Sequence, residues 1–379
     1  MRIGIVLISD GIGGTEKRLA ALFQYLARQR RHQYYLVVSD RMLQSLRRQQ
    51  ILTDDSLEIH RFELGRWHSA LRRLPGTYYT GFPVWRYGLA RALRRANAHA
   101  ATDVFHYGIP ASYLMAPREF RRHAVMEAQG SKNDWLRLAT GRAGARAGCI
   151  VNCLTPLIYD AMRAGVEPAV KVRFHASPGS VLTAKIGDSQ QPKPQPPVIA
   201  FVARLEPIKN PLLFVDAMAR LAQRTGEFRV SICGEGRLSA AVKAAIAGYG
   251  LTGRVHLSYH DHPLEVLAET SVFVSLQTSD NYPSQALLEA MASGCATVAS
   301  DVGMTGRLVT PDTGLRVPFD PQAIADAAWS LISNRDRIAA MGRAARELVY
   351  RDHSMPAYAR YVEGLYGLAA VSHGADRDQ

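Results

Sequence analysis

The chain has 379 residues, too many for one ordinary hydrophobic core, so two domains are expected. Its composition, 47% hydrophobic and 21% charged, is typical of a soluble globular protein. No run of uncharged apolar residues reaches the roughly 18 that span a bilayer. The sequence opens directly on an apolar strand, so we expect no signal peptide and a cytoplasmic location. The cysteines lack the spacing of a zinc site and predict buried thiols: Cys149, Cys153, Cys233 and Cys295.

The net charge of +13 is concentrated in the first half of the chain. Residues 1–190 contain 28 Lys and Arg against 14 Asp and Glu, a net of +14, whereas residues 191–379 contain 18 against 19. This asymmetry favours an anionic partner for the first half, namely a membrane surface, a phosphorylated acceptor or nucleic acid. An Arg-rich composition with solvated charged faces explains it equally well.

The first half begins as a strand, a glycine-rich turn, a helix and a second strand. The strand covers residues 2–9, the turn Asp10–Lys17, the helix about 15–28 and the second strand 34–39. Such a turn can bind phosphate, but the third glycine of the dinucleotide fingerprint is missing near Lys17. Asp40 follows the second strand, as a ribose-binding acid would. The turn is therefore either a ligand loop or simply a tight turn.

A basic and aromatic stretch follows, over residues 66–86, between helices predicted at 43–50 and 89–98. Its tryptophans, tyrosines and arginines could lie at a membrane interface. A loop packed under the first domain is the alternative. No nucleic-acid-binding motif is visible, so no nucleic acid is expected as a partner.

Further strands are predicted at residues 103–108, 124–131, 150–155 and 172–179, and their ends place several polar side chains at one edge of the sheet: His106, Gln129, Ser131 and His175. Each also fits an ordinary loop position. A proline-rich spacer then separates two domains. The predicted boundaries are 1–188 for the first domain, 189–197 for the linker, 198–370 for the second domain and 371–379 for a polar tail.

The second half repeats the alternation of strands and helices. Its predicted strands are 198–202, 228–233, 255–257, 272–276, 296–300 and 314–318, and its predicted helices 211–225, 238–249, 264–268, 284–292, 321–333, 335–350 and 357–368. The fold class is therefore α/β, with two Rossmann-like domains facing each other across a cleft. Gly294 stands where the helix 284–292 should be capped. Glu289 is an isolated acid on that mostly apolar helix and suggests a ribose partner.

These motifs resemble the family 4 glycosyltransferases, which are retaining enzymes of the GT-B fold. Arg204 and Lys209, in the sequence Ala-Arg-Leu-Glu-Pro-Ile-Lys-Asn, are similar to the basic pair that binds the donor diphosphate in that family. Gly234-Glu235-Gly236 resembles the Gly-x-Gly motif after the next strand. Residues 281–289 resemble the Glu-x7-Glu signature. The resemblance implies a nucleotide-sugar donor site with these residues: Gly13, Gly14, Arg204, Lys209, Gly234, His260, Asn281, Ser284, Gln285 and Glu289.

Two positions depart from the family pattern. The first acid of the signature is replaced by Asn281, and neighbouring Asp280 is shifted by one residue. The family's catalytic-region histidine is matched best by Gln129, with His106 a weak substitute. By resemblance Gln129 and Asn281 are the catalytic-site residues, and His106 and Ser131 are acceptor-side candidates.

The sequence therefore predicts a retaining glycosyltransferase of the hexosyltransferase type. It would move a sugar from a nucleoside-diphosphate sugar to a glycan or lipid-linked acceptor, in cell-surface polysaccharide or lipopolysaccharide synthesis, without a metal or other cofactor. Its Arg-rich half would contact the acceptor and an anionic inner membrane face. Two alternatives stay open: a nicotinamide-dependent oxidoreductase, and an inactive basic binding protein of the same fold.

Overall fold

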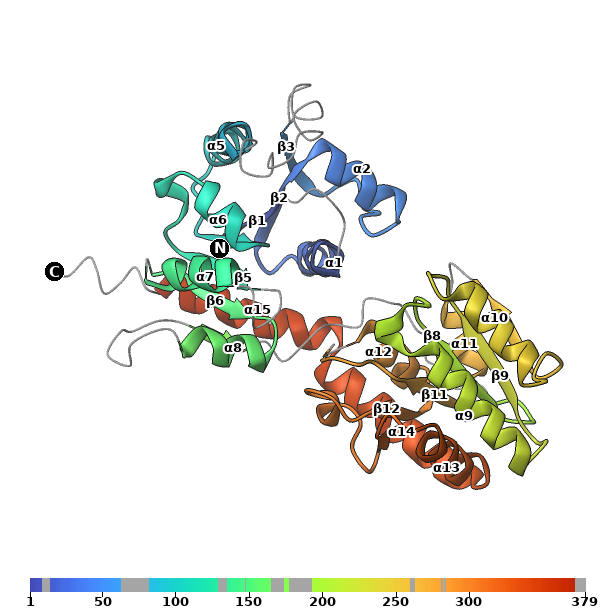
Figure 1. Cartoon of the computed structure of the whole chain (residues 1–379). Coiled ribbons are helices and arrows are strands. Elements are labelled where there is room, and N and C mark those ends of the chain that lie inside the picture. Colours follow the sequence, from blue (N-terminus) through green and yellow to red (C-terminus); the bar gives the residue numbers. More distant parts are fainter. Residues whose placement is uncertain are drawn as a thin grey trace. The chain divides into compact units, whose positions relative to one another are not determined.

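The computed structural model describes residues 1–8, 14–62, 82–128, 135–146, 148–164, 174–176, 193–259, 263–280, 282 and 284–371. The chain divides into two compact units. The first comprises Met1–Gly179 together with Met355–Gln379, and the second comprises Ser180–Ser354. Each unit is built on one parallel β-sheet with helices packed on it (Figure 1).

The first unit contains a seven-stranded sheet in the order β3-β2-β1-β4-β5-β6-β7. Its strands are β1 (Arg2–Leu7), β2 (Gln33–Ser39), β3 (Glu58–Phe62), β4 (Val104–Tyr107), β5 (Ala124–Ala128), β6 (Ile150–Cys153) and β7 (Phe174–Ala176). Its helices are α1 (Gly14–Gln29), α2 (Asp40–Arg48), α5 (Phe82–Asn97), α6 (Pro110–Met115), α7 (Trp135–Arg146), α8 (Pro156–Arg163) and α15 (Met355–Val371). A short 3-10 helix, η1, covers Arg118–Phe120.

The second unit contains a six-stranded sheet in the order β10-β9-β8-β11-β12-β13. Its strands are β8 (Val198–Val202), β9 (Arg229–Cys233), β10 (Val255–Ser258), β11 (Val272–Ser275), β12 (Ala296–Ser300) and β13 (Gly314–Val317). Its helices are α9 (Pro211–Arg224), α10 (Ser239–Gly248), α11 (Pro263–Glu269), α12 (Gln285–Ala292), α13 (Pro321–Ile332) and α14 (Arg335–Asp352). The predicted class, two Rossmann-like α/β domains, is confirmed. In both sheets the strand order reverses beside the first strand, which is the arrangement that creates a ligand crevice.

The central strands β8 and β11 of the second sheet are almost entirely apolar because helices cover both faces of the sheet. Side chains alternate along β8: Ile199 and Phe201 join the core under α9 and α13, and Ala200 and Val202 join the core under α12 and α14. This alternation follows from the period of two in a strand. The four cysteines are free and buried, as expected, and none of the described helices is long and apolar enough to cross a membrane.

Helix α15 belongs to the first unit, although the sequence-based boundaries place it in the second domain. It lies against β4, β5 and α1 (Figure 1). Tyr358, Val362 and Tyr366 are among its fully buried residues. Helical periodicity shows which face of α15 is apolar but does not show which sheet that face covers.

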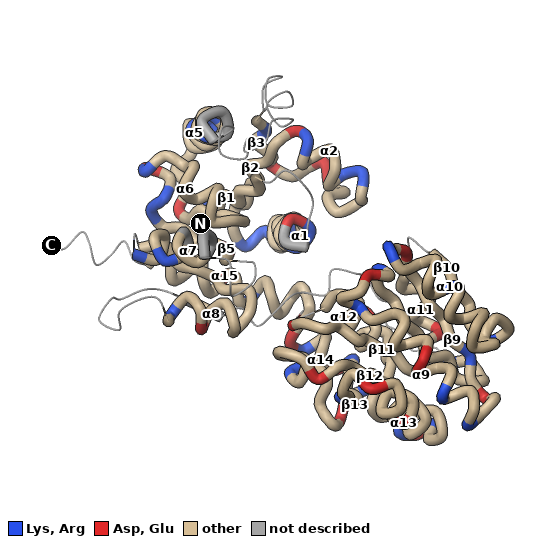
Figure 2. Tube along the Cα trace, viewed as in Figure 1, with Lys and Arg blue, Asp and Glu red and all other residues tan. Residues whose placement is uncertain are grey.

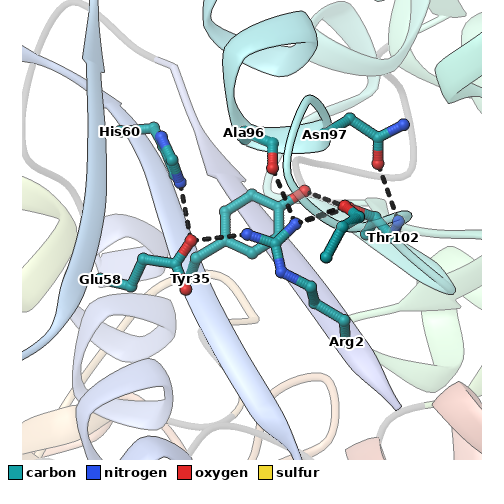
Figure 3. Close-up of polar contacts among 8 residues, drawn as sticks. Arg2, Tyr35, Glu58, His60, Ala96, Asn97 and Thr102 are labelled. Atoms are coloured by element: carbon teal, nitrogen blue, oxygen red, sulfur yellow. Dashed lines mark hydrogen bonds and ion pairs between the residues drawn. The ribbon is translucent and has the colours of Figure 1, made fainter.

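The Arg2 side chain links residues near the amino ends of strands β1, β2 and β3 in the first unit (Figure 3). The Arg2 guanidinium donates to the Ala96 carbonyl at 2.8 Å and to Glu58 Oε1 at 2.6 Å, and it lies 4.4 Å from the centre of the Tyr35 ring. The Tyr35 hydroxyl is hydrogen-bonded to Thr102 at 2.7 Å. Strand β3, which supplies Glu58, was not predicted, because its short Glu-Ile-His-Arg-Phe sequence is largely polar.

Residues 193–197 of the expected linker are attached to the second unit. The Lys193 ammonium donates to the carbonyls of Leu267 (3.2 Å), Ala268 (2.9 Å) and Ser293 (2.8 Å), where α11 and α12 end. A cation at a helix C-terminus is favoured by the helix dipole. Burial lowers the pKa of Lys193, and the three carbonyls accept all of its donors.

We expect Lys193→Met to lower the free energy of unfolding by about 1–3 kcal/mol, because it leaves three partly buried carbonyls without this donor. Urea unfolding of the whole chain measures the change. Lys243→Met is the matched control, since Lys243 is exposed on α10. Equal urea midpoints for Lys193→Met and wild type would show that the Lys193 hydrogen bonds do not stabilise the folded chain.

Candidate functional site

The loops after β8 and β11 are hydrogen-bonded to each other at the carboxyl edge of the second sheet. The Lys209 ammonium donates to Gln277 Oε1, the Asn210 side chain donates to the Leu276 carbonyl at 3.0 Å, and the Thr278 amide donates to the Ile208 carbonyl at 3.0 Å. Strands β8 and β11 are the neighbours at which the strand order reverses. The loop that carries Arg204 and Lys209 therefore lies where α/β sheets bind ligands.

Two cations in this loop lack a neutralising acid. The Arg204 side chain is exposed, and its guanidinium makes no hydrogen bond or ion pair with any described residue. Lys209 is half-buried, and burial together with the Arg204 charge lowers the pKa of Lys209. The nearby Glu206 carboxylate is already paired with Arg237 at 2.6 Å, which holds its pKa below the usual value. An anion bound between Arg204 and Lys209 would relieve their repulsion.

Gly234 allows the loop after β9 to pass close to the loop after β8. Its φ of +151° is rarely adopted by other residues, and a Cβ there would overlap the Ala203 carbonyl oxygen. Its amide donates to the Ser258 carbonyl at 3.0 Å. Gly236 is equally constrained, since a Cβ would lie 2.5 Å from the Leu205 carbonyl oxygen. We therefore assign the Gly-x-Gly sequence a role in shaping the cationic loop.

Helix α12 begins beside the same edge, after β11. Its N-cap residue is Ser284, which is buried and whose side chain makes no capping hydrogen bond. The amides of the first helical turn have no partner within a helix, and the helix dipole makes this end attractive to anions. Gln285 and Glu289, one turn apart, lie on the same side of the helix. Gly294 caps the other end with φ +72°, as predicted.

The Asp280 side chain is bound within the loop after β12. Its Oδ1 accepts from the Met304 amide at 2.9 Å, and its side chain packs on Gly303, in the loop after β12. This carboxylate therefore serves the loop after β12 and does not replace the acid missing at position 281.

The structure brings most of the described donor-site candidates to one edge of the second sheet. Arg204, Lys209 and Gly234 follow the adjacent strands β8 and β9, and Ser284, Gln285 and Glu289 follow β11 on the other side of β8. Gly14, from the first unit, is the first residue of α1. The remaining candidates lie outside the described residues: Gly13, Gln129, Ser131, His260 and Asn281. Within the described ranges, no group of three or more His, Cys, Asp or Glu side chains is arranged to hold a metal ion.

His106, expected on the acceptor side, is instead fully buried within the first unit. Its Nε2 is hydrogen-bonded to Glu127 Oε1 at 3.0 Å and its Nδ1 to the Tyr366 hydroxyl at 2.8 Å. Because α15 covers β4 and β5, the imidazole has no open face toward an acceptor. The expectation of a surface role for His106 is therefore corrected.

Glu127 is the centre of this buried network. Its carboxylate accepts from Arg18 at 2.8 Å, from Asn152 at 2.9 Å and from Tyr358 at 3.4 Å. Burial raises the pKa of Glu127, but the Arg18 charge and the hydrogen bonds from His106 and Asn152 outweigh it and lower the pKa to about 2. The carboxylate is therefore ionised at neutral pH.

Sequence reasoning missed this network, although a signal was present. A charged or polar residue interrupts three neighbouring apolar strands, at His106, Glu127 and Asn152. Glu127 and Asn152 are paired directly in the sheet register. A buried polar group requires a partner, so three such residues in adjacent strands predict a common cluster.

We expect Glu127→Gln to lower stability most at neutral pH. The pKa of Glu127 is about 2 in the folded chain and lies near 4.5 when unperturbed, so its stabilisation is present above pH 4.5 and is lost as the pH falls toward 2. The groups that face the carboxylate are Arg18, His106, Asn152, Cys153, Tyr358, Tyr361 and Tyr366.

Urea unfolding at several pH values gives the difference in unfolding free energy between wild type and Glu127→Gln. This difference should be about 3–5 kcal/mol at neutral pH, because the variant leaves Arg18 as an uncompensated buried charge, and it should shrink as the pH falls below 4.5. A difference that stays constant with pH would contradict the assignment of an ionised, buried Glu127.

Comparison with known proteins agrees with this geometry. Residues 184–348 match the family model of glycosyl transferases group 1. The chain is 33% identical over 150 residues to a GDP-mannose-dependent alpha-mannosyltransferase of Mycobacterium tuberculosis, covering 39% of this chain and 37% of that protein. It spans less than half the length of the first curated relatives that it matches.

Solved structures share the fold over the whole length. The lipopolysaccharide outer core galactosyltransferase WaaB superposes with a TM-score of 0.70 at 16% identity, covering 98% of this chain and 100% of WaaB. The Anabaena protein HepE, solved with UDP, superposes with a TM-score of 0.69 at 15% identity, covering 96% of this chain and 99% of HepE. The chain has the GT-B fold, and its residues 184–348, which include the loops of the candidate site, match the family model of glycosyl transferases group 1.

Proposed function

We propose that the chain is a retaining glycosyltransferase of family 4. It would move a sugar from a nucleoside-diphosphate sugar to a glycan or lipid-linked acceptor, in polysaccharide or lipopolysaccharide synthesis. The observation that carries the proposal is the pair of uncompensated cations, Arg204 and Lys209, at the reversal point of the second sheet. This pair lies within the segment that matches the glycosyl transferases group 1.

Charge development explains what the pair would do. When the sugar leaves, negative charge grows on the diphosphate, and fixed cations and helix amides stabilise that charge most in the transition state. The Arg204 guanidinium can bind two phosphate oxygens at once, and the Lys209 ammonium, oriented by Gln277, acts as a point charge. The amides that follow Ser284 would complete the cradle, so no metal or other cofactor is needed in this scheme.

The resemblance to the family supplies the remaining roles. Glu289 would bind the ribose, Asn281 the hydroxyls of the transferred sugar, and the loop that contains His260 would contact the base. Gly13 and Gly14 would approach the diphosphate, and Gln129 and Ser131 would lie beside the reacting sugar and acceptor. Because Asn281 is neutral, the sugar would be bound there by hydrogen bonds alone.

Titration calorimetry with UDP-, GDP- and ADP-sugars tests the donor site. We expect Arg204→Ala and Lys209→Ala each to weaken binding of the preferred donor about 10- to 100-fold, the loss typical of a charge-assisted hydrogen bond. Arg335→Ala, on an exposed arginine of α14, is the control and should bind normally. Unchanged donor affinity in Arg204→Ala would overturn the diphosphate assignment. Binding of a nicotinamide cofactor in place of nucleotide-sugars would favour the oxidoreductase.

We further propose that the first unit meets its acceptor at an anionic membrane surface. The proposal is based on a basic face that helix α5 exposes. This face consists of the exposed side chains Arg86, Tyr87, Arg91, Arg94 and Arg95. Arg94 is paired with Glu119 at 3.2 Å, whereas Arg86, Arg91 and Arg95 have no ion-pair partner among the described residues. Tyr87 is 72% exposed, and lysines and arginines gather along α5 and after α6 in Figure 2. Arginines beside an exposed tyrosine suit a phospholipid headgroup layer.

Co-sedimentation with vesicles of phosphatidylcholine and phosphatidylglycerol tests this face. Each basic residue near such a surface contributes about 1 kcal/mol, so Arg91→Glu with Arg95→Glu should weaken low-salt binding by at least about tenfold. Arg335→Glu with Arg343→Glu makes the same charge change on exposed residues of α14 and should bind like wild type. Failure of wild type to sediment even at low salt would overturn the membrane proposal and leave the donor site untouched.

A further inference from the structure

A buried ion pair joins the beginning of α1 to the end of β5 in the first unit. Arg18 Nη2 and Glu127 Oε2 lie 2.8 Å apart, and their side chains are only 3% and 0% exposed. Arg18 lies in the second turn of α1, whose first residue, Gly14, follows the glycine-rich turn. Glu127 precedes the last residue of β5, and Gln129 follows that strand in the chain.

Five elements fix the geometry of this pair. His106 from β4 and Asn152 from β6 bond to the same Glu127 oxygen, at 3.0 and 2.9 Å. Helix α15 adds three hydroxyls: Tyr358 reaches Glu127 at 3.4 Å, Tyr361 donates to Asn152 at 2.7 Å, and Tyr366 is bonded to His106 at 2.8 Å. The pair is thus held by α1, β4, β5, β6 and α15 together.

Stability alone does not account for this arrangement. Removing a carboxylate and a guanidinium from water costs several kcal/mol for each ion, and apolar residues of similar volume often stabilise a core as well or better. A charged pair with many directional hydrogen bonds fixes the relative positions of the elements that carry it, which an apolar contact does not do. Strands β1 and β5 are both parallel to β4, so the chain leaves both of them at the same edge of the sheet.

We propose that the Arg18–Glu127 pair is a positioning centre for sugar transfer. It fixes the start of α1, which follows the glycine-rich turn, against the end of β5, which Gln129 follows in the chain. The inference rests on the proposed transferase function. Glu127 acts through the backbone it positions and does not take up the acceptor proton, since it is fully buried and already bonded to four side chains. The pair should therefore affect the transfer step more strongly than donor affinity.

The test uses the whole chain with Arg18→Met and Glu127→Gln combined. Glutamine keeps the oxygen that Asn152 and His106 bond, and removing both charges together leaves neither Arg18 nor Glu127 as an unpaired ion. The control is Val151→Ala, a core truncation in β6 whose side chain faces the opposite side of the sheet from Asn152. Three quantities are measured: kcat with donor saturating, donor Kd, and hydrogen exchange of peptides covering residues 14–20 and 124–128.

In the double variant kcat at saturating donor should fall about 10- to 100-fold, the effect of a small misplacement of reacting groups, and this loss should exceed any change in donor Kd. Exchange should accelerate at residues 14–20 and 124–128. Val151→Ala should lower Tm by creating a cavity but retain kcat below its Tm. Wild-type exchange and kcat in the double variant would overturn the proposal, as would an equal loss of kcat in Val151→Ala.

The two proposals fail in different ways. If wild type transfers no sugar from any donor, the transferase function is wrong, and the exchange comparison still decides whether the pair positions α1 against β5. If Glu127→Gln alone unfolds, the test is made with the double variant, in which Arg18 is no longer left as an unpaired charge.

Discussion

The reversal of strand order beside β8 is the constraint on which the second unit's chemistry depends. Parallel strands direct all their carboxyl ends to one edge, and α/β sheets bind ligands at that edge where the strand order reverses. Hydrogen bonds between residues 208–210 and 276–278 join the loops after β8 and β11 there. The glycine at 234 then lets a third loop approach, so backbone geometry decides where the cations stand before any ligand binds.

The functional charges of the two units differ in their exposure to solvent: those of the second unit are accessible, and those of the first unit are buried. Arg204 is exposed, Lys209 is half-buried, and the nearby Glu206 is paired with Arg237, so the positive potential of Arg204 and Lys209 is available to an anion. Arg18 is removed from water and is stable only because Glu127 compensates it at 2.8 Å. The accessible cations Arg204 and Lys209 are suited to binding a ligand, whereas the buried Arg18–Glu127 ion pair is suited to fixing the positions of the elements around it.

Much of the second unit could be predicted from the sequence, and less of the first. The strand Val198–Val202 and the cap at Gly294 agree with the structure because apolar runs and glycine caps are local signals. The donor-site residues came from a motif, and the structure gathers those it describes at one edge. Strand β3 was missed because an edge strand needs little apolar mass. The place of α15 was missed because it depends on contacts between residues more than 200 positions apart, such as Tyr358 and Glu127. The Glu127 network was missed although polar residues interrupt three neighbouring apolar strands.

A crystal structure of the chain with the nucleoside diphosphate that stabilises it most tests the central claim directly. The account predicts the diphosphate oxygens within hydrogen-bonding distance of the Arg204 guanidinium and the Lys209 ammonium, beside the first turn of α12. A diphosphate bound elsewhere, with Arg204 and Lys209 still facing solvent, would contradict it.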